Sequence, residues 1–302
     1  MTDTLHFSRE VADALQSERP VVALESTLIT HGLPWPENVS TALAMDAAVR
    51  EAGAVPAIIA ILAGQMTVGV ERDELDRLAR TSNVRKCSRR DLAIAVARGE
   101  TASTTVSGTL IIAHRAGLKI FATGGIGGVH RGAPFDVSAD LPELGRMPFG
   151  VVCSGAKAIL DLRLTLERLE TYGVPIVGFG TDTCPGFYSC SSGLGVDARV
   201  DSPLEAARLI ETSRRIDARH AVIIAVPVPK EDEIPAGIIE SAIEEAIVDA
   251  EARQIQGKLL TPFLLKRVDE LTSGAASRAN RALLVNNARV AALIARELGS
   301  LK

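Results

Sequence analysis

Residues 20–62 read PVVALESTLITHGLPWPENVSTALAMDAAVREAGAVPAIIAIL, and this stretch decides the predicted fold. The apolar runs 20–24 and 55–62 have the length and composition of strands that are buried on both faces of a sheet. Residues 37–52 between them are long enough for a helix, and Gly53 is placed to end it. A strand, a helix and a second strand in this order predict two parallel strands joined across one face of a sheet.

The same alternation continues to the end of the chain. Further strands are expected at residues 119–123, 149–153, 174–178 and 221–226. Helices are expected at residues 71–80, 88–99, 105–116, 157–172, 234–254, 262–272 and 280–298. The pattern predicts an α/β fold of three layers, α/β/α, with a largely parallel central sheet, formed by residues 1–302 as a single domain.

The composition is that of an ordinary globular protein. Hydrophobic residues make up 47% of the 302 residues and charged residues 23%, which excludes extensive disorder. The 33 basic and 37 acidic residues give a net charge of −4, and the aromatic residues are 7 Phe, 2 Tyr and 1 Trp. Nucleic-acid-binding proteins need a basic surface and often stack bases on aromatic rings, so no nucleic-acid partner is expected.

Cysteine usage and hydropathy predict the compartment. Four cysteines without a C-x-x-C pair predict reduced thiols, rather than a zinc site or a disulfide framework. The first twenty residues mix acids and bases and lack the apolar region of a signal peptide. The most apolar stretch, residues 55–63, is about half as long as a membrane-spanning helix. We therefore expect a cytoplasmic protein without a membrane partner.

Polar residues gather just beyond the expected strands. They are Glu25, Lys86, the loop 124–131 and Lys157. In parallel α/β sheets ligands bind beyond the carboxyl ends of the strands. These residues are therefore expected to surround one ligand site.

Glu25 and Lys157 are the candidates for proton transfer and nucleophilic attack. A carboxyl group at the mouth of a buried strand is partly desolvated, which favours the protonated acid. Lys157 lies where residues 149–153 lead into an expected helix, and burial together with the positive helix end favours a neutral amine that can form a Schiff base. Alternatively, Glu25 caps a helix or pairs with an arginine, and Lys157 binds phosphate or extends into solvent.

The loop 124–132 reads GGIGGVHRG and directly follows an expected strand. Its backbone N–H groups, with Arg131 nearby, would suit an anion such as the phosphate of a small ligand. The spacing is not G-x-G-x-x-G, so a dinucleotide site is not favoured. Alternatively, the glycines serve only the geometry of the turn.

Three further features suit metal or phosphate binding. Asp136, Ser138 and Asp140 present oxygen atoms at alternate positions, which suits a hard cation such as Mg²⁺ or Mn²⁺, or else an Asx turn or helix cap. Lys86 and the pair 89–90 suit a single phosphate, or else form a solvated basic surface. Residues 104–106 form an expected helix start, which is a natural site for an anion.

Amides also lie on the last expected helix. Asn280, Asn286 and Asn287 interrupt an otherwise aliphatic pattern there. Buried amides must find hydrogen-bond partners, either in the neighbouring backbone or in a bound sugar.

Several motifs in this order resemble the pseudouridine-5′-phosphate glycosidase family, also called indigoidine-synthase-A-like. They are VALEST (22–27), KCSRRDL (86–92), FATGGIGGVHRG (121–132), SADL (138–141), GAK (155–157), TPFLL (261–265) and NN (286–287). The resemblance spans nearly the whole chain, and GGIGGVHRG is its most specific part. It departs at residues 132–135, which read GAPF in place of a longer polar segment, and at Cys190, where relatives often carry arginine.

The resemblance implies an α/β/α fold, a homotrimer and a divalent metal ion, usually Mn²⁺. It also implies reversible cleavage of the C–C glycosidic bond of pseudouridine 5′-phosphate to uracil and ribose 5-phosphate. Lys157 matches the lysine that forms the covalent adduct at C1′ of the opened ribose, Glu25 the proton donor and Asp136 the metal ligand. The residues that match substrate contacts are Lys86, Val106, Ser138, Ala139 and Asp140.

A lysine with one acid suits this reaction. An ordinary glycosidase protonates a leaving heteroatom between two carboxylates, and a C–C glycosidic bond has no such atom. A lysine imine with the opened sugar instead provides an electron sink for the bond that breaks. Two other classes stay open: a Schiff-base aldolase or related lyase acting on a sugar phosphate, and a non-catalytic regulator that binds a sugar phosphate. Of the three classes, only the glycosidase releases a pyrimidine.

Overall fold

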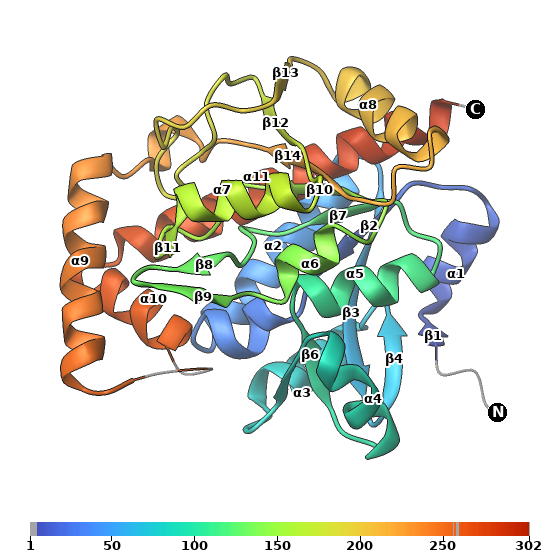
Figure 1. The fold of residues 1–302 in the computed structure, drawn as a ribbon. Helices are drawn as coiled ribbons and strands as arrows, with labels where there is room; N and C mark the ends of the chain where they lie inside the picture. Colours follow the sequence, from blue (N-terminus) through green and yellow to red (C-terminus); the bar gives the residue numbers. More distant parts are fainter. Residues whose placement is uncertain (1–4, 256, 258–259, 302) are drawn as a thin grey trace.

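A large sheet occupies the centre of the molecule in the computed structural model, which describes residues 5–255, 257 and 260–301 (Figure 1). Within this part of the chain, eleven strands join into that sheet. Its main path runs, in spatial order, through β1 (Leu5–Phe7), β4 (Gln65–Val68), β3 (Val55–Leu62), β2 (Val21–Leu24), β7 (Ile120–Ala122), β10 (Gly150–Cys153), β14 (Val222–Ala225), β12 (Ile176–Phe179) and β13 (Ala198–Val200). Off this path, β6 (Ala102–Thr104) pairs with β3 and with β5 (Arg85–Cys87).

Most neighbouring strands of this sheet run parallel. From β3 through β2, β7, β10, β14 and β12 to β13 every pairing is parallel. The antiparallel pairings are those of β3 with β4 and with β6. The predicted α/β fold with a largely parallel central sheet is therefore confirmed.

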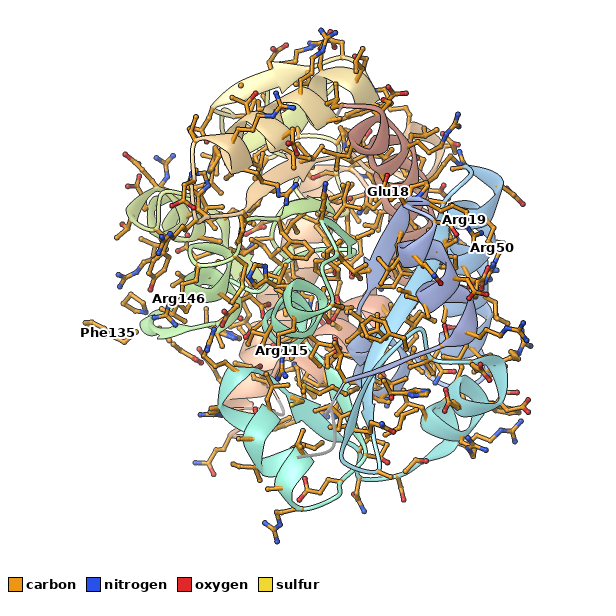
Figure 2. All side chains as sticks on the ribbon, turned by 90° about the vertical axis from the view of Figure 1, so that its right-hand side faces the viewer. Glu18, Arg19, Arg50, Arg115, Phe135 and Arg146 are labelled. Atoms are coloured by element: carbon orange, nitrogen blue, oxygen red, sulfur yellow. The ribbon has the colours of Figure 1, made fainter. Side chains whose placement is uncertain are left out.

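A smaller antiparallel sheet lies next to the large one. It consists of β11 (Leu160–Asp161), β8 (Val129–His130) and β9 (Ala133–Val137), with β8 in the middle. The hairpin of β8 and β9 follows β7 after the glycine-rich loop, which places it near the carboxyl edge of the large sheet. Phe135 on β9 is 94% exposed, and its ring projects away from the rest of the molecule (Figure 2).

Helices cover both faces of the large sheet. They are α1 (Arg9–Gln16), α2 (Glu37–Glu51), α3 (Arg72–Arg80), α4 (Arg89–Ala97), α5 (Val106–Arg115), α6 (Asp140–Leu144), α7 (Leu162–Thr171), α8 (Pro203–Arg215), α9 (Ala236–Ala252), α10 (Leu260–Leu271) and α11 (Ala275–Ser300), with a π-helix at Leu28–Gly32 and a 3₁₀-helix at Lys230–Asp232. Helix α11 packs on β2, β7 and β10 and against α2 and α8. Figure 1 shows α5, α6 and α7 on the opposite face.

Buried apolar side chains hold these layers together. The largest cluster of them extends from α1 to α11 and includes all four side chains of β2 and all four of β14. Within the described residues, no helix is long and apolar enough to cross a membrane. Cys87, Cys153, Cys184 and Cys190 are free thiols, as their spacing predicts.

The expected strands and most expected helices agree with the structure within a few residues. The helix expected at 157–172 is an exception, because it begins only at Leu162. Residues 160–161 instead form β11, which pairs with β8, and the Asp161 side chain accepts a hydrogen bond from the Leu164 N–H at 2.9 Å and so caps α7. Lys157 therefore does not lie at a helix N-terminus, and that part of the sequence interpretation is wrong.

The glycines of the GGIGG loop are needed for close packing. None of Gly124, Gly125, Gly127 and Gly128 is among the described glycines with a positive φ, so turn geometry does not require them. A Cβ atom on Gly125 would lie 2.6 Å from the Phe187 ring, and one on Gly128 would lie 2.7 Å from Thr165 Cγ2. At these glycines the loop passes too close to its neighbours to carry a side chain.

We expect Gly128→Ala to lower the free energy of unfolding by about 1–3 kcal/mol, the usual range for overpacking a buried site. Thr165 cannot move aside easily, because it is fully buried and its Oγ1 bonds the Asp161 carbonyl at 2.6 Å and the Val129 N–H at 3.0 Å. Thermal and urea unfolding measure the change. Gly195→Ala is the control, because nothing lies within 4 Å of its added methyl group. Equal stability of both variants would contradict this packing argument.

Candidate active site

A pocket of about 340 Å³ lies beyond the carboxyl ends of β2, β7 and β10. It is formed by segments from six separate parts of the chain. The lining residues are Glu25, Thr27, Lys86, Ser88, Arg90, Asp91, Thr105, Val106, Gly127, Gly128, His130, Asp136, Val137, Ser138, Ala139, Asp140, Lys157, Ile159, Leu160 and Thr261. The structure thus brings together the eight residues that the family resemblance assigns to the site, namely Glu25, Lys86, Val106, Asp136, Ser138, Ala139, Asp140 and Lys157. Their individual roles stay predictions.

Glu25 directly follows β2, and its side chain is 6% exposed. One carboxylate oxygen accepts a hydrogen bond from the Thr27 hydroxyl and the other accepts one from the Thr123 hydroxyl. These two bonds hold the carboxylate in one orientation, and each oxygen keeps lone-pair capacity for a proton. Neither threonine was singled out from the sequence, although Thr123 occupies the same place after β7 that Glu25 occupies after β2.

Lys157 is half-buried and lies four residues beyond β10. Its backbone N–H donates to the Ile126 carbonyl at 3.1 Å, so the position of its Cα is set by the glycine-rich loop. Its side-chain amine makes no hydrogen bond or ion pair with another residue of the described ranges. An amine that has no partner in the described part of the chain and lies at a pocket is available to a ligand.

The loops that follow β7 and β10 run side by side. Hydrogen bonds join Thr123 N to Val152 O at 3.0 Å, Ser154 N to Gly124 O at 2.8 Å and Ile126 N to Gly155 O at 3.1 Å. Ile126 and Ala156 form a parallel bridge between them. The pairing of β7 with β10 therefore continues beyond the sheet as far as Lys157.

Three backbone amides of the glycine-rich loop, which the sequence offered as an anion-binding nest, are already bonded within the protein. The Ile126 N–H donates to Gly155, the Gly127 N–H donates to Asp140 at 2.9 Å and the Val129 N–H donates to Thr165 at 3.0 Å. These amides already have acceptors within the protein, so they are not available together for a ligand.

Arg131 also has a different place from the one expected. Its guanidinium donates to the carbonyls of Ala158 at 3.0 Å and Leu160 at 3.2 Å, and it pairs with Glu240 of α9. It does not line the pocket. Arg131 thus fastens the segment that follows Lys157 to the β8–β9 hairpin, and it does not bind an anion in the pocket.

Basic groups and two helix starts form one end of the pocket. Lys86 and Arg90 line it, as do Ser88 and Thr105, the N-cap residues of α4 and α5. Helix N-termini and cations both attract anions, so this end suits a phosphate. Arg89, the other arginine of the expected pair, instead forms a bidentate ion pair with the buried Glu143.

Asp140 forms part of the pocket wall, with its side chain 6% exposed. One carboxylate oxygen accepts from the Ser107 N–H at 3.0 Å and the other from the Gly127 N–H at 2.9 Å. Asp140 therefore ties the start of α5 to the glycine-rich loop. This structural use of Asp140 is additional to the substrate contact predicted for it.

Asp136 suits a hydrated hard cation. It lies on β9 at the pocket rim, is exposed, and has no hydrogen-bond or ion-pair partner among the described residues. In the same described part of the chain, no three His, Cys, Asp or Glu side chains gather closely enough to hold a metal ion by themselves. Mg²⁺ and Mn²⁺ are commonly held by one or two carboxylates with water or ligand oxygens in the remaining positions, so a single free carboxylate fits such an ion. His130 also lines the pocket and was not singled out from the sequence.

Two buried thiols, those of Cys153 and Cys184, are poor nucleophiles. Cys153 ends β10, close to Lys157 in the sequence, and burial raises the pKa of its thiol to about 12. Burial likewise raises the pKa of Cys184 to about 11. Because the thiolate is the reactive form, both groups are unreactive near neutral pH.

A second, larger cavity of about 1170 Å³ adjoins the pocket at Lys86. His31, Tyr188, Asp269 and Asn280 are among the residues that line it. Of the eight residues predicted for the site, Lys86 alone lines this cavity. The smaller pocket is therefore the candidate active site, despite its size.

The chain is similar to known proteins over nearly its whole length. The family model described as indigoidine synthase A like protein matches residues 10–297. A pseudouridine-5′-phosphate glycosidase of Caldanaerobacter subterraneus subsp. tengcongensis is 51% identical over 303 residues, covering 100% of this chain and 99% of the relative. The enzyme of that name in Geobacillus kaustophilus is 52% identical over 300 residues, covering 99% and 100%.

A solved structure has the same fold. The prealnumycin C-glycosynthase AlnA, in complex with ribulose 5-phosphate, superposes with a TM-score of 0.91 at 40% sequence identity, covering 98% of this chain and 97% of AlnA.

The two aspartates of the pocket predict opposite effects on stability. Asp140→Asn should lower the free energy of unfolding by about 1–3 kcal/mol, because one backbone N–H would then face an amide NH₂ group in place of a carboxylate oxygen. Asp136→Asn should stay within about 0.5 kcal/mol of the wild type, because that side chain is exposed and without a partner among the described residues. Urea unfolding of the two variants measures the difference. A destabilised Asp136→Asn beside an unchanged Asp140→Asn would refute the assignment.

Proposed function

The chain belongs to the indigoidine synthase A-like family, and we propose that it reversibly cleaves the C–C glycosidic bond of pseudouridine 5′-phosphate to uracil and ribose 5-phosphate. Relatives that are about half identical over their full length carry the name of this activity. AlnA, which shares the fold, is named for C-glycoside chemistry and was solved with a sugar phosphate. No nucleic acid takes part in the proposed reaction.

The observation that supports this proposal most strongly is the meeting of Glu25 and Lys157 in one pocket. They come from loops separated in sequence by more than a hundred residues, and both line about 340 Å³ of space with a basic end. One acid, one amine without a described protein partner and a phosphate-binding end are the groups that this reaction requires.

Lys157 is assigned the role of nucleophile. Its neutral amine forms a bond to C1′ of the ribose while the C1′–O4′ bond breaks and O4′ takes up a proton. The nitrogen gives up one proton to the carboxylate of Glu25, and its lone pair then forms a C1′=N bond as the C1′–C5 bond breaks. That electron pair returns to the pyrimidine ring, whose C5 has taken a proton. Water hydrolyses the imine, which releases ribose 5-phosphate and restores the amine.

Glu25 is assigned the donation of protons in these steps. The hydroxyls of Thr27 and Thr123 keep its carboxyl group aimed in one direction while it gains and loses a proton. Burial of the side chain excludes most water, so the proton passes to the substrate and not to solvent. This restraint by two short side chains is what a general acid needs.

The phosphate is assigned to the basic end of the pocket, formed by Lys86, Arg90 and the start of α5 at Val106. Substrate contacts at Ser138, Ala139 and Asp140, which line the same pocket, complete the assignment. An anchored phosphate would fix the sugar relative to Lys157, because C1′ and the 5′-phosphate lie at opposite ends of the ribose.

A divalent metal ion, Mn²⁺ by family resemblance, is part of the proposal. Asp136 would hold it, and the bound ion would supply positive charge and ordered water at the pocket rim. The homotrimeric assembly rests on the same resemblance. The cytoplasmic location rests on the four free thiols, and both stay predictions.

Replacing Lys157 tests the nucleophile. Lys157→Gln should lower the rate of uracil release from pseudouridine 5′-phosphate by about 10³-fold or more, because no other amine replaces the covalent step. Borohydride reduction in the presence of ribose 5-phosphate should attach the sugar to the peptide that contains Lys157, as read by mass spectrometry. Lys119→Gln, an exposed lysine just before β7, is the control. Uracil release that persists in Lys157→Gln would exclude this mechanism. Consumption of a sugar phosphate without release of uracil would instead favour the aldolase class.

Replacing Arg90 tests the phosphate end. Arg90→Ala should raise KM for pseudouridine 5′-phosphate about tenfold or more, because a charge-assisted hydrogen bond contributes about 1.5–3 kcal/mol. Activity on unphosphorylated pseudouridine should change little. Arg98→Ala removes the same charge just beyond the far end of α4 and is the control. An equal rise in KM for both variants would show that only the overall charge matters.

A further inference from the structure

We propose that Asn287 is the positioning residue that sets the spacing between Glu25 and Lys157. It lies on α11, far from both groups in the sequence, and does not line the pocket. The inference rests on the proposed function only in its assignment of these two residues as the reacting pair. What it adds is a third element of the fold that determines how they face each other.

The side chain of Asn287 joins the two loops that leave β7 and β10. Its amide nitrogen donates to the Thr123 carbonyl at 2.9 Å and to the Ser154 hydroxyl at 3.1 Å, with the Gly124 carbonyl at 3.4 Å. The Ser154 hydroxyl can in turn donate to Asn287 Oδ1 at 3.4 Å. A primary amide has two N–H donors, and here they divide between one loop and the other.

Both loops lead directly to the reacting groups. Thr123, whose carbonyl accepts from Asn287, uses its hydroxyl to hold the Glu25 carboxylate. Ser154 is three residues before Lys157, and the intervening Gly155 is held in a left-handed conformation with φ +81°. Asn287 therefore acts on Glu25 through two hydrogen bonds, by way of Thr123, and on Lys157 through its bond to Ser154 and one short, constrained segment.

The surroundings of Asn287 show why it is not a packing residue. Its side chain is fully buried, on the face of α11 that also buries Leu283, Leu284, Val290 and Ala291. An amide costs free energy when it is buried without hydrogen bonds, and an aliphatic residue would fill the same space without that cost. The amide at this position is therefore explained by the bonds it makes.

Asn287→Leu keeps the volume of the side chain and removes both donors. We expect kcat for uracil release to fall about 10- to 100-fold, the effect of a misplacement of roughly 1 Å between reacting groups. KM should change less than about threefold, because the phosphate-binding residues belong to other elements. Because a smaller fraction of folded enzyme would also lower the apparent kcat at unchanged KM, kcat is expressed per folded enzyme, with the folded fraction measured by circular dichroism and thermal unfolding.

The second readout does not need the glycosidase reaction. Borohydride trapping of ribose 5-phosphate on Lys157 reports directly on how well the amine is placed, and its rate should fall by a similar factor in Asn287→Leu. Ser154→Ala removes the shared hydroxyl with a smaller change in volume and should show part of the same loss. The double variant should be no slower than Asn287→Leu alone, because both substitutions break one network.

Two controls separate positioning from stability. Asn286→Leu is the same change at the preceding position, which is half-buried and makes no hydrogen bond with its side chain among the described residues. Leu298→Ala at the far end of α11 removes buried volume and should lower the melting temperature without affecting kcat.

The outcomes are distinguishable. Wild-type rates of uracil release and trapping in Asn287→Leu would overturn the inference, as would a loss of kcat in Leu298→Ala equal to that in Asn287→Leu at a similar melting temperature. If Asn287→Leu does not fold, wild-type kcat and trapping in Ser154→Ala overturn it. If the wild-type enzyme releases no uracil, the proposed function fails, and the trapping rates of the wild type and the variants still decide whether Asn287 positions Lys157.

Discussion

Two loops that leave neighbouring parallel strands stay hydrogen-bonded to each other beyond the end of the sheet, and the candidate active site depends on this contact. Residues 123–126 and 154–157 continue the pairing of β7 with β10 through backbone bonds of 2.8–3.1 Å. Only glycine fits at Gly125, because a Cβ atom there would meet the Phe187 ring and the Gly155 carbonyl. The position of Lys157 is thereby set by the main chain, which is the most rigid support that a sheet can offer.

Much of the fold was predictable because its signals are local. The apolar strands of the central sheet are three to eight residues long, and the helices between them end at glycines such as Gly53, which has φ +85°. The short strands β8 and β11 have two residues each, too few for any periodicity. Their pairing displaced the start of α7, which is why the helix expected at Lys157 begins only at Leu162.

The candidate site was predictable in part, for a related reason. Glu25 and Lys157 stand just after apolar runs, and the topology of a parallel sheet places such positions at one edge. Their hydrogen-bond partners come from distant parts of the chain: Thr123 is 98 residues from Glu25, and Asn287 is 164 residues from Thr123. No local spacing predicts such pairs. The motif likewise could not show that three amides of the loop are occupied, because their acceptors, such as Asp140 and Thr165, lie outside it.

The wall of the pocket is already internally bonded. The carboxylates of Glu25 and Asp140 and three amides of the glycine-rich loop, those of Ile126, Gly127 and Val129, have partners within the protein. Lys157 and Asp136 have none among the described residues, so these two side chains keep their rotamer freedom. A ligand that enters would order such side chains against a wall whose bonded parts are already fixed. Binding then loses less conformational entropy than it would at a disordered loop, and this smaller loss favours affinity.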